Sequence, residues 1–134
     1  MQMSAALDNK VDKHQAAAVG VKTALAILDK WGASPEQSQG ILQLSRASWY
    51  KLRKDPAAVA LNHDQFERIS YLLNIHAALR TIFDNPENVY GFMSMDNHNP
   101  FFSGRSPLRI IGTGSFGALY EVHKRIDALR GGQW

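Results

Sequence analysis

The stretch SPEQSQGILQLSRASWYKLRK, residues 34–54, contains two helix starts in close succession. Ser34 and Pro35 open the first, because serine caps free backbone N–H groups and the proline ring suits the first helical turn. Ser45 offers a second cap, and the helix that it opens has to end before Pro56, since proline disfavours helical angles in the residue before it. The stretch therefore predicts two short helices separated by a tight turn.

Two short helices joined in this way are typical of a helix-turn-helix, whose second helix enters the major groove of DNA. We expect Leu44 to fill the space between the helices and Gly40 to let them approach closely. Trp49 and Leu52 lie three residues apart, so we expect both to face the core. Gln43 stands at the turn position that glycine usually occupies, which leaves the details of the DNA contacts open.

The outward face of the second helix is basic, because residues 46–54 contain four cations and no acidic residue. Arg46 suits a guanine edge or a phosphate, and the later cations suit phosphates. A solvated helix face and a purely structural helical hairpin are the alternatives. The candidate DNA contacts are Arg46, Ser48, Tyr50, Lys51, Arg53 and Lys54.

The charge of the chain is unevenly distributed along its 134 residues. Residues 1–61 contain eight Lys and Arg against five acidic residues, which accounts for the whole net charge of +3. Residues 62–134 contain seven of each and are neutral. A polyanion such as DNA is therefore expected to bind the front half.

Composition excludes several classes of protein. With 45% hydrophobic and 20% charged residues, the chain is expected to be globular, and no apolar run is long enough to span a membrane. We expect no signal peptide and no membrane partner. The chain contains no cysteine, which excludes disulfides and thiolate metal sites and suits a location in the cytoplasm. The histidines show no paired metal-ligand spacing, so we expect no metal and no cofactor, with His76 and His123 as hydrogen-bonded helix residues.

Helical patterns continue on both sides of residues 34–54, and no segment alternates with a period of two, so the chain is predicted to be all-α. We expect a flexible tail over 1–14, a helix-turn-helix domain over 15–61 and a second helical domain over 62–134. About seven helices are expected, at residues 15–31, 35–43, 46–54, 63–84, 86–93, 107–111 and 115–130.

The long helix 63–84 has apolar residues on two faces, as a central or interface helix would. Leu72, Ile75 and Leu79 are candidates for a dimer interface, because operators are often palindromic and their readers two-fold symmetric. Burial of these three side chains in the core is the alternative.

Two motifs in the back half have a structural and a functional interpretation. Residues 112–117, GTGSFG, resemble a phosphate-binding GxGxxG loop, but no predicted strand precedes them, so we expect glycines that link two helices. Phe101 and Phe102 interrupt a turn-rich stretch, where they either anchor the loop to the core or contact a partner.

The residues from Ile69 to Trp134 resemble the C-terminal domain of the MbcA/ParS/Xre antitoxins. The strings that carry the resemblance are LLNIHAALRTIF (72–83), NPFFSGRSPLRIIGTG (99–114) and LYEVHKRIDALRGGQW (119–134). Together with the helix-turn-helix, the resemblance covers residues 20–134. It is closest to Xre antitoxins paired with RES-domain toxins, which consume NAD.

This resemblance implies a toxin-binding domain whose C-terminal end obstructs the NAD pocket of the toxin. The implied contacts are Arg130, Gly131, Gly132, Gln133 and Trp134. Tryptophan and arginine are enriched among binding hot spots, and Arg130 suits carboxylates that line a pocket for a cationic ring. The alternatives for Trp134 are packing against its own domain and disorder.

The sequence therefore predicts an antitoxin of a type II toxin–antitoxin system that represses its own operon. Its expected partners are the cognate RES-domain toxin, operator DNA and a second copy of the chain, with higher-order toxin–antitoxin complexes. The alternative is a stand-alone transcriptional regulator without a toxin. An enzyme is not expected, because the sequence offers no nucleophile–base pair, metal cluster or credible phosphate loop.

Overall fold

Helices make up all of the regular structure in the part of the chain that the computed structural model describes. It describes the backbone of residues 2–132 and the side chains from residue 15 onward. Within that part there are seven α-helices, one 3-10 helix and no strand, which confirms the all-α prediction. The elements are α1 (Gln2–Lys30), α2 (Pro35–Leu42), α3 (Arg46–Lys54), α4 (His63–Ile82), α5 (Pro86–Gly91), η1 (Phe92–Ser94), α6 (Pro107–Ile111) and α7 (Phe116–Arg130).

The predicted helix starts are confirmed by their cap geometry. The Ser34 hydroxyl accepts the N–H of Gln37 at 3.0 Å, and the Gln37 side chain accepts the N–H of Ser34 at 2.9 Å, which completes the capping box. Asn62 and Gln65 make the same reciprocal pair at the start of α4. Ser45 caps α3 by accepting the N–H of residue 48.

Three helix boundaries differ from the prediction by two residues or more. One is the end of α5 at Gly91 instead of residue 93, where η1 follows. α1 begins at Gln2 instead of near residue 15, because residues 2–15 contain neither glycine nor proline and nothing interrupts the helical backbone. α4 ends at Ile82, and Phe83 leaves the helix with extended backbone angles. Flexibility of residues 1–14 and the domain division at 61/62 stay predictions.

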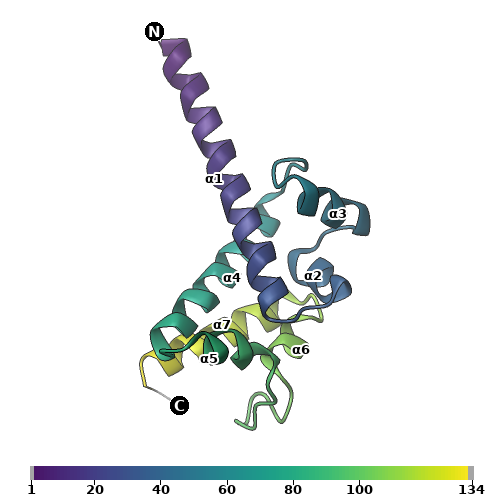
Figure 1. The fold of residues 1–134 in the computed structure, drawn as a ribbon, viewed down its shortest axis with the longest axis vertical. Coiled ribbons are helices and arrows are strands. Elements are labelled where there is room, and N and C mark those ends of the chain that lie inside the picture. The colour runs from purple at the N-terminus through teal and green to yellow at the C-terminus, as the bar shows by residue number, and fades with distance from the viewer. Residues whose placement is uncertain (1, 133–134) are drawn as a thin grey trace.

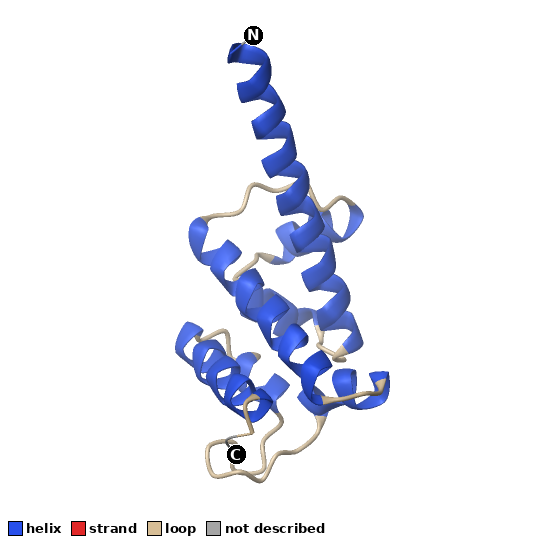
Figure 2. Ribbon diagram, turned by 90° about the vertical axis from the view of Figure 1, so that its left-hand side faces the viewer, coloured by secondary structure: helices blue, strands red, loops and turns tan. Residues whose placement is uncertain are grey.

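The long helix α4 lies at the centre of the molecule. It packs against α7 on one side and against α1 on another, while α6 lies beside α7 and η1. α2 packs against α4, and α3 packs against α1 (Figure 1). The N-terminal part of α1 extends away from the rest, and the start of α1 and the end of α7 lie at opposite ends of the molecule (Figures 1 and 2).

One continuous hydrophobic core joins the two halves, running from Val21 to Ile126. Leu72, Ile75 and Leu79 lie inside it, each with 0% of its surface exposed. The prediction that these three side chains form a dimer interface is therefore corrected to core burial, because they offer no surface to a second copy.

Two further expectations from the back half are settled by the fold. Phe102 is fully buried and anchors its loop to the core, while the Arg125 guanidinium lies 4.0 Å from the centre of the Phe101 ring. Residues 112–115 link α6 to α7, so the glycines join two helices as expected.

In the described part of the chain, no helix is both long and apolar enough to cross a membrane.

Candidate DNA-binding and toxin-binding sites

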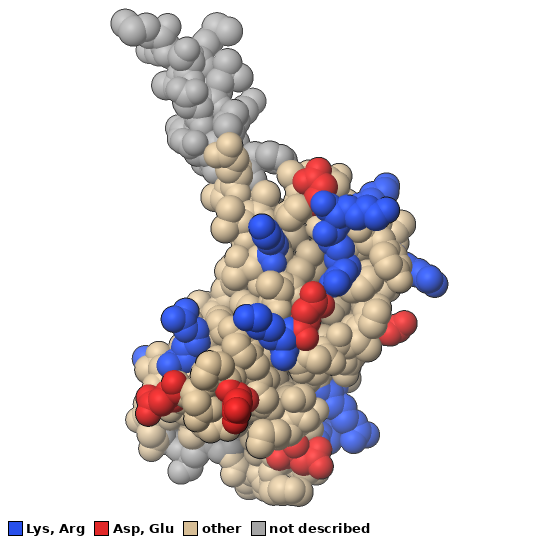
Figure 3. All heavy atoms as spheres, in the orientation of Figure 1, with Lys and Arg blue, Asp and Glu red and all other residues tan. Residues whose placement is uncertain are grey.

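The recognition helix of the helix-turn-helix, α3, has one buried and one exposed face. Trp49 and Leu52 are buried at 5% and 1% exposed, as predicted, because they lie one turn apart on the core side. Arg46 and Lys51 are exposed on the opposite face. Lys and Arg side chains gather over α3 at the upper right of the molecule (Figure 3). The predicted DNA contacts therefore lie on a solvent-facing basic surface, apart from Ser48, which is half-buried.

Two of the arginines on this surface pack against aromatic rings of α3. The Arg46 guanidinium lies 5.7 Å from the centre of the Tyr50 ring, and Tyr50 meets Trp49 edge-on at 4.8 Å. Arg53 is predicted as a phosphate contact, yet its Nη1 donates to both carboxylate oxygens of Asp29 at 3.0 and 3.2 Å. It also covers the Trp49 ring at 4.7 Å. Arg53 thus links α3 to α1, while Arg46, Lys51 and Lys54 are exposed on α3.

The turn of the helix-turn-helix is held by Gln43, the residue that replaces glycine. Its backbone is left-handed, with φ 54° and ψ 47°, a conformation that costs a residue with a side chain about 1 kcal/mol or more. The side-chain amide compensates by donating to the Gly40 carbonyl at 2.8 Å and, at 3.4 Å, to that of Gly114. The Gln43 carbonyl accepts from Gln65 at 2.8 Å, so α4 also holds the turn.

Gly40 is needed for a different close approach from the one that the sequence predicted. A Cβ atom at Gly40 would lie 3.2 Å from the carbonyl oxygen of Gly112, in the connection between α6 and α7. The prediction that Gly40 gives room to the second helix of the motif is therefore corrected. The small residue accommodates a loop of the C-terminal half.

Arg68 is the structural residue that sequence reasoning missed. It is 6% exposed, and its Nε pairs with Asp64 at 2.9 Å. Its Nη1 donates to the Ile41 carbonyl at 3.1 Å and to the Gly114 carbonyl at 2.9 Å. The only signals in the sequence are Asp64 four residues earlier and the position of Arg68 beside the apolar stripe of α4.

The predicted toxin-binding residues lie at the end of α7. Arg130 is exposed and its Nε donates to Asp127 at 3.0 Å, while Gly131 and Gly132 follow the helix, the latter with φ +77°. The remaining predicted contacts, Gln133 and Trp134, lie outside the described residues. A polar hollow of about 380 Å³ lies beside this end, between α4 and α7, lined by Asn74, Ala77, Ala78, Thr81, His123, Asp127 and Arg130.

The two histidines singled out in the sequence pack against aromatic rings. His76 stacks on Tyr90 at 5.4 Å, and its buried Nδ1 finds no hydrogen-bond partner within the described part of the chain. Burial, with the charges of Arg80 and Lys30 nearby, lowers the pKa of His76. Burial also lowers the pKa of His123, against the opposing effect of Asp127. No group of three or more His, Asp or Glu side chains capable of holding a metal occurs among the described residues.

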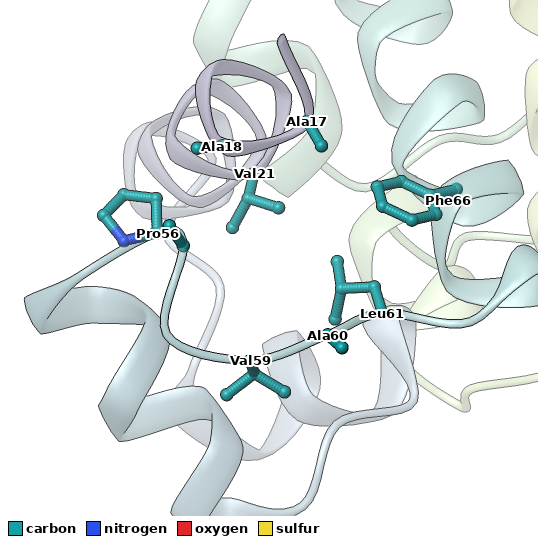
Figure 4. A pocket seen from close by; sticks show the side chains of 9 residues that line it. Ala17, Ala18, Val21, Pro56, Val59, Ala60, Leu61 and Phe66 are labelled. Atoms are coloured by element: carbon teal, nitrogen blue, oxygen red, sulfur yellow. The ribbon is translucent and has the colours of Figure 1, made fainter. Parts of the chain in front are cut away.

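An apolar groove of about 290 Å³ opens between α1 and the connection from α3 to α4. Ala17 and Val21 point into it from α1, and Leu61 and Phe66 face them from the other side (Figure 4). Phe66 is 38% exposed, and Val19 on the neighbouring turn of α1 is 64% exposed. The groove therefore adjoins the connection that follows α3.

Comparisons with known proteins identify two domains in succession along the chain. The family model described as the antitoxin Xre-like helix-turn-helix domain matches residues 10–74, and that of the antitoxin Xre/MbcA/ParS C-terminal toxin-binding domain matches residues 78–132. The chain is 33% identical over 107 residues to the uncharacterized protein y4oB of Sinorhizobium fredii (strain NBRC 101917 / NGR234), covering 79% of this chain and 80% of that protein. With both domains matched in order along one fold, the chain belongs to the Xre/MbcA/ParS family of antitoxins.

Proposed function

We propose that this protein neutralises a RES-domain toxin that consumes NAD, and that it represses the promoter of its own operon. The observation that carries the proposal is the presence, in one chain, of an exposed basic recognition helix and a toxin-binding domain. The pairing with a RES-domain toxin is supported by the resemblance of residues 69–134 to Xre antitoxins with such partners.

Neutralisation is proposed to depend on the end of α7. The helix ends at Arg130, and Gly131 and Gly132 after it are exposed, the latter with φ +77°. Arg130 is exposed and carries the charge that suits the carboxylates of an NAD pocket. The antitoxin thus acts by occupying the site that NAD needs, and it supplies no catalytic group of its own.

Repression is proposed to depend on α3. Arg46 lies in its first turn, where residues of a recognition helix reach base edges, and Lys51 and Lys54 lie along the exposed side, where phosphates run. A bound antitoxin would then block the promoter without any further chemistry.

Removing residues 130–134 tests the toxin half of the proposal. We expect the shortened protein to fold and to bind promoter DNA like the full chain, but to lose protection of cells that express the neighbouring RES-domain toxin. The matched control is Arg109→Ala, which removes an exposed arginine from α6 in the same domain and should protect fully. Full protection by the shortened protein would contradict the proposed role of the tail.

The stand-alone regulator is the alternative function, and co-purification separates the two. Expression of the protein together with the adjacent reading frame should yield a complex with a small NAD-consuming partner. Recovery of the antitoxin alone, with promoter binding intact, would favour the regulator.

We also propose that two copies of the chain associate through α1 and the groove beside it. The N-terminal part of α1 extends beyond the body (Figure 1), and beside the groove this helix carries Ala18, which lines it, and Val19, which is 64% exposed. A second α1 is the occupant that fits the groove, because one surface then provides both an apolar helix and its acceptor, as a two-fold interface requires.

Glutamate substitutions in the loop after α3 test this contact. Ala60 lines the groove and Ala58 does not, although both are exposed on the same loop. By sedimentation equilibrium, we expect the unmodified chain and Ala58→Glu to have twice the 14.9 kDa of one chain, and Ala60→Glu to be monomeric. Identical masses for the two variants would exclude the groove as the interface.

A further inference from the structure

The toxin-binding domain contacts the turn of the helix-turn-helix directly. We propose that residues 112–115, the connection between α6 and α7, position the recognition helix, so that full DNA affinity requires this loop of the other domain. The proposal rests on the proposed DNA binding and adds which part of the chain sets its strength. Gly114, Gln43 and Arg68 are its positioning residues, and none of them is a predicted DNA contact.

The first observation is the closeness of two backbones. A Cβ atom at Gly114 would lie 3.1 Å from the Gly40 carbonyl oxygen and 3.0 Å from the Gln43 side-chain amide. Gly40 in turn has the Gly112 carbonyl oxygen 3.2 Å from its own Cβ position. Side chains rarely make contacts this close, so a Cβ atom at Gly40 or Gly114 would have to displace the facing backbone or the Gln43 amide.

The second observation is a buried arginine side chain that hydrogen-bonds to both sides of the same contact. One nitrogen of Arg68 donates to a carbonyl of α2, that of Ile41, and to the Gly114 carbonyl in the loop. Ile41 lies in the last turn of α2, where carbonyls lack helical partners, so the guanidinium satisfies a group that the helix leaves open. The Phe116 ring lies 5.6 Å from the guanidinium and covers its other side.

The third observation is how little chain separates this contact from α3. Only Gln43, Leu44 and the cap Ser45 lie between the end of α2 and the first residue of the recognition helix. Gln43 makes hydrogen bonds to both Gly114 and α4, and Leu44 is buried. A displacement of the loop would therefore pass into the direction of α3 instead of being absorbed by a flexible connection.

A matched pair of glycine substitutions tests the proposal in the full chain. Gly114→Ala and Gly104→Ala both place a side chain in the C-terminal domain at nearly the same backbone angle, with φ +84° and +83°. At Gly104 the nearest atoms, in the His98 ring, are 3.6 Å away, which is ordinary contact. With a labelled promoter duplex in fluorescence anisotropy, we expect Gly114→Ala to bind at least about tenfold more weakly than Gly104→Ala.

The salt dependence separates a misplaced helix from mere instability. A recognition helix that no longer follows the groove loses phosphate contacts, so the slope of log affinity against log salt should be shallower by about 1 for Gly114→Ala only. Toxin binding should remain in both variants. If Gly114→Ala fails to fold, Gln43→Gly serves instead, because glycine tolerates the left-handed turn while the side-chain bridge to Gly114 is lost.

The outcomes test the positioning role of residues 112–115 separately from the proposed repression. Equal promoter affinity for Gly114→Ala and Gly104→Ala would overturn the positioning role, and so would equal loss in both. With the second variant, affinity of Gln43→Gly within twofold of the unmodified chain would overturn it. Failure of the unmodified chain to bind promoter DNA would instead reject the proposed repression.

Discussion

The exposed face of α3 and the junction beneath the turn use arginine in opposite ways. On α3, Arg46 is exposed, and its guanidinium lies 5.7 Å from the centre of the Tyr50 ring. In the junction, which we define as Gly40, Gln43, Arg68, Gly112 and Gly114, the arginine is buried and donates to a carboxylate and two backbone carbonyls. Arg46 therefore remains available to a ligand, whereas Nε and Nη1 of Arg68 are already paired within the protein.

In this chain, burial and not charge separates the proposed binding residues from the architectural ones. Exposed ion pairs contribute about 0–1 kcal/mol, because water already solvates both charges. A buried arginine with several acceptors contributes more, since its removal leaves polar groups without partners in a place that water reaches poorly. Arg53, half-exposed and paired with Asp29, lies between the two cases.

Loss of the α3 surface is expected to have the largest effect. Arg46→Ala combined with Lys51→Ala should weaken promoter binding about 200-fold, because a base-edge contact and a phosphate contact together supply about 3 kcal/mol. Gel shift or anisotropy measures the affinity. Toxin binding and thermal unfolding should not change, and promoter affinity equal to that of the unmodified chain would remove α3 from the DNA site.

Loss of the buried arginine should have the next largest effect, and on stability. Arg68→Met leaves the Ile41 and Gly114 carbonyls without their donor, so the free energy of unfolding should fall by about 2 kcal/mol. Arg53→Met, which breaks an exposed pair, should cost less than about 1 kcal/mol. Urea denaturation of both variants checks the difference, and equal losses would show that burial does not distinguish the two arginines.

The smallest expected effect concerns pH and the back half. The pKa of His76 is lowered in the folded chain, mainly by burial, so below its ordinary value of 6.5 the unfolded chain takes up a proton first. Stability should therefore fall as the pH drops below about 6.5. His76→Phe keeps a ring against Tyr90 and should fall less steeply between pH 7 and 5. Parallel stability curves would contradict this assignment.

Local features of the fold were predictable because they depend on neighbours in sequence. The caps at Ser34, Ser45 and Asn62 each act over three residues, and the core positions Trp49 and Leu52 follow from helical spacing. The basic face of α3 was predictable for the same reason, since one helix carries all of it.

The junction was not predictable because its members are distant in sequence. Nothing near Gly40 indicates that it meets Gly112, and only the packing of α4 against the loop brings Arg68 to two carbonyls. The dimer candidates failed for a related reason. Apolar spacing shows that Leu72, Ile75 and Leu79 share a face, but whether that face is covered by α1 and α7 or by a second copy is a tertiary question.

Binding measurements on two variants test most directly whether α3 binds DNA and the end of α7 binds the toxin independently of each other. The promoter duplex and the RES-domain toxin proposed as the partner are each titrated into the Arg46→Ala/Lys51→Ala variant and into the chain lacking residues 130–134. We predict that the first variant loses only the DNA and the second only the toxin. Loss of both partners in either variant, or retention of both, would contradict two separate sites on one fold.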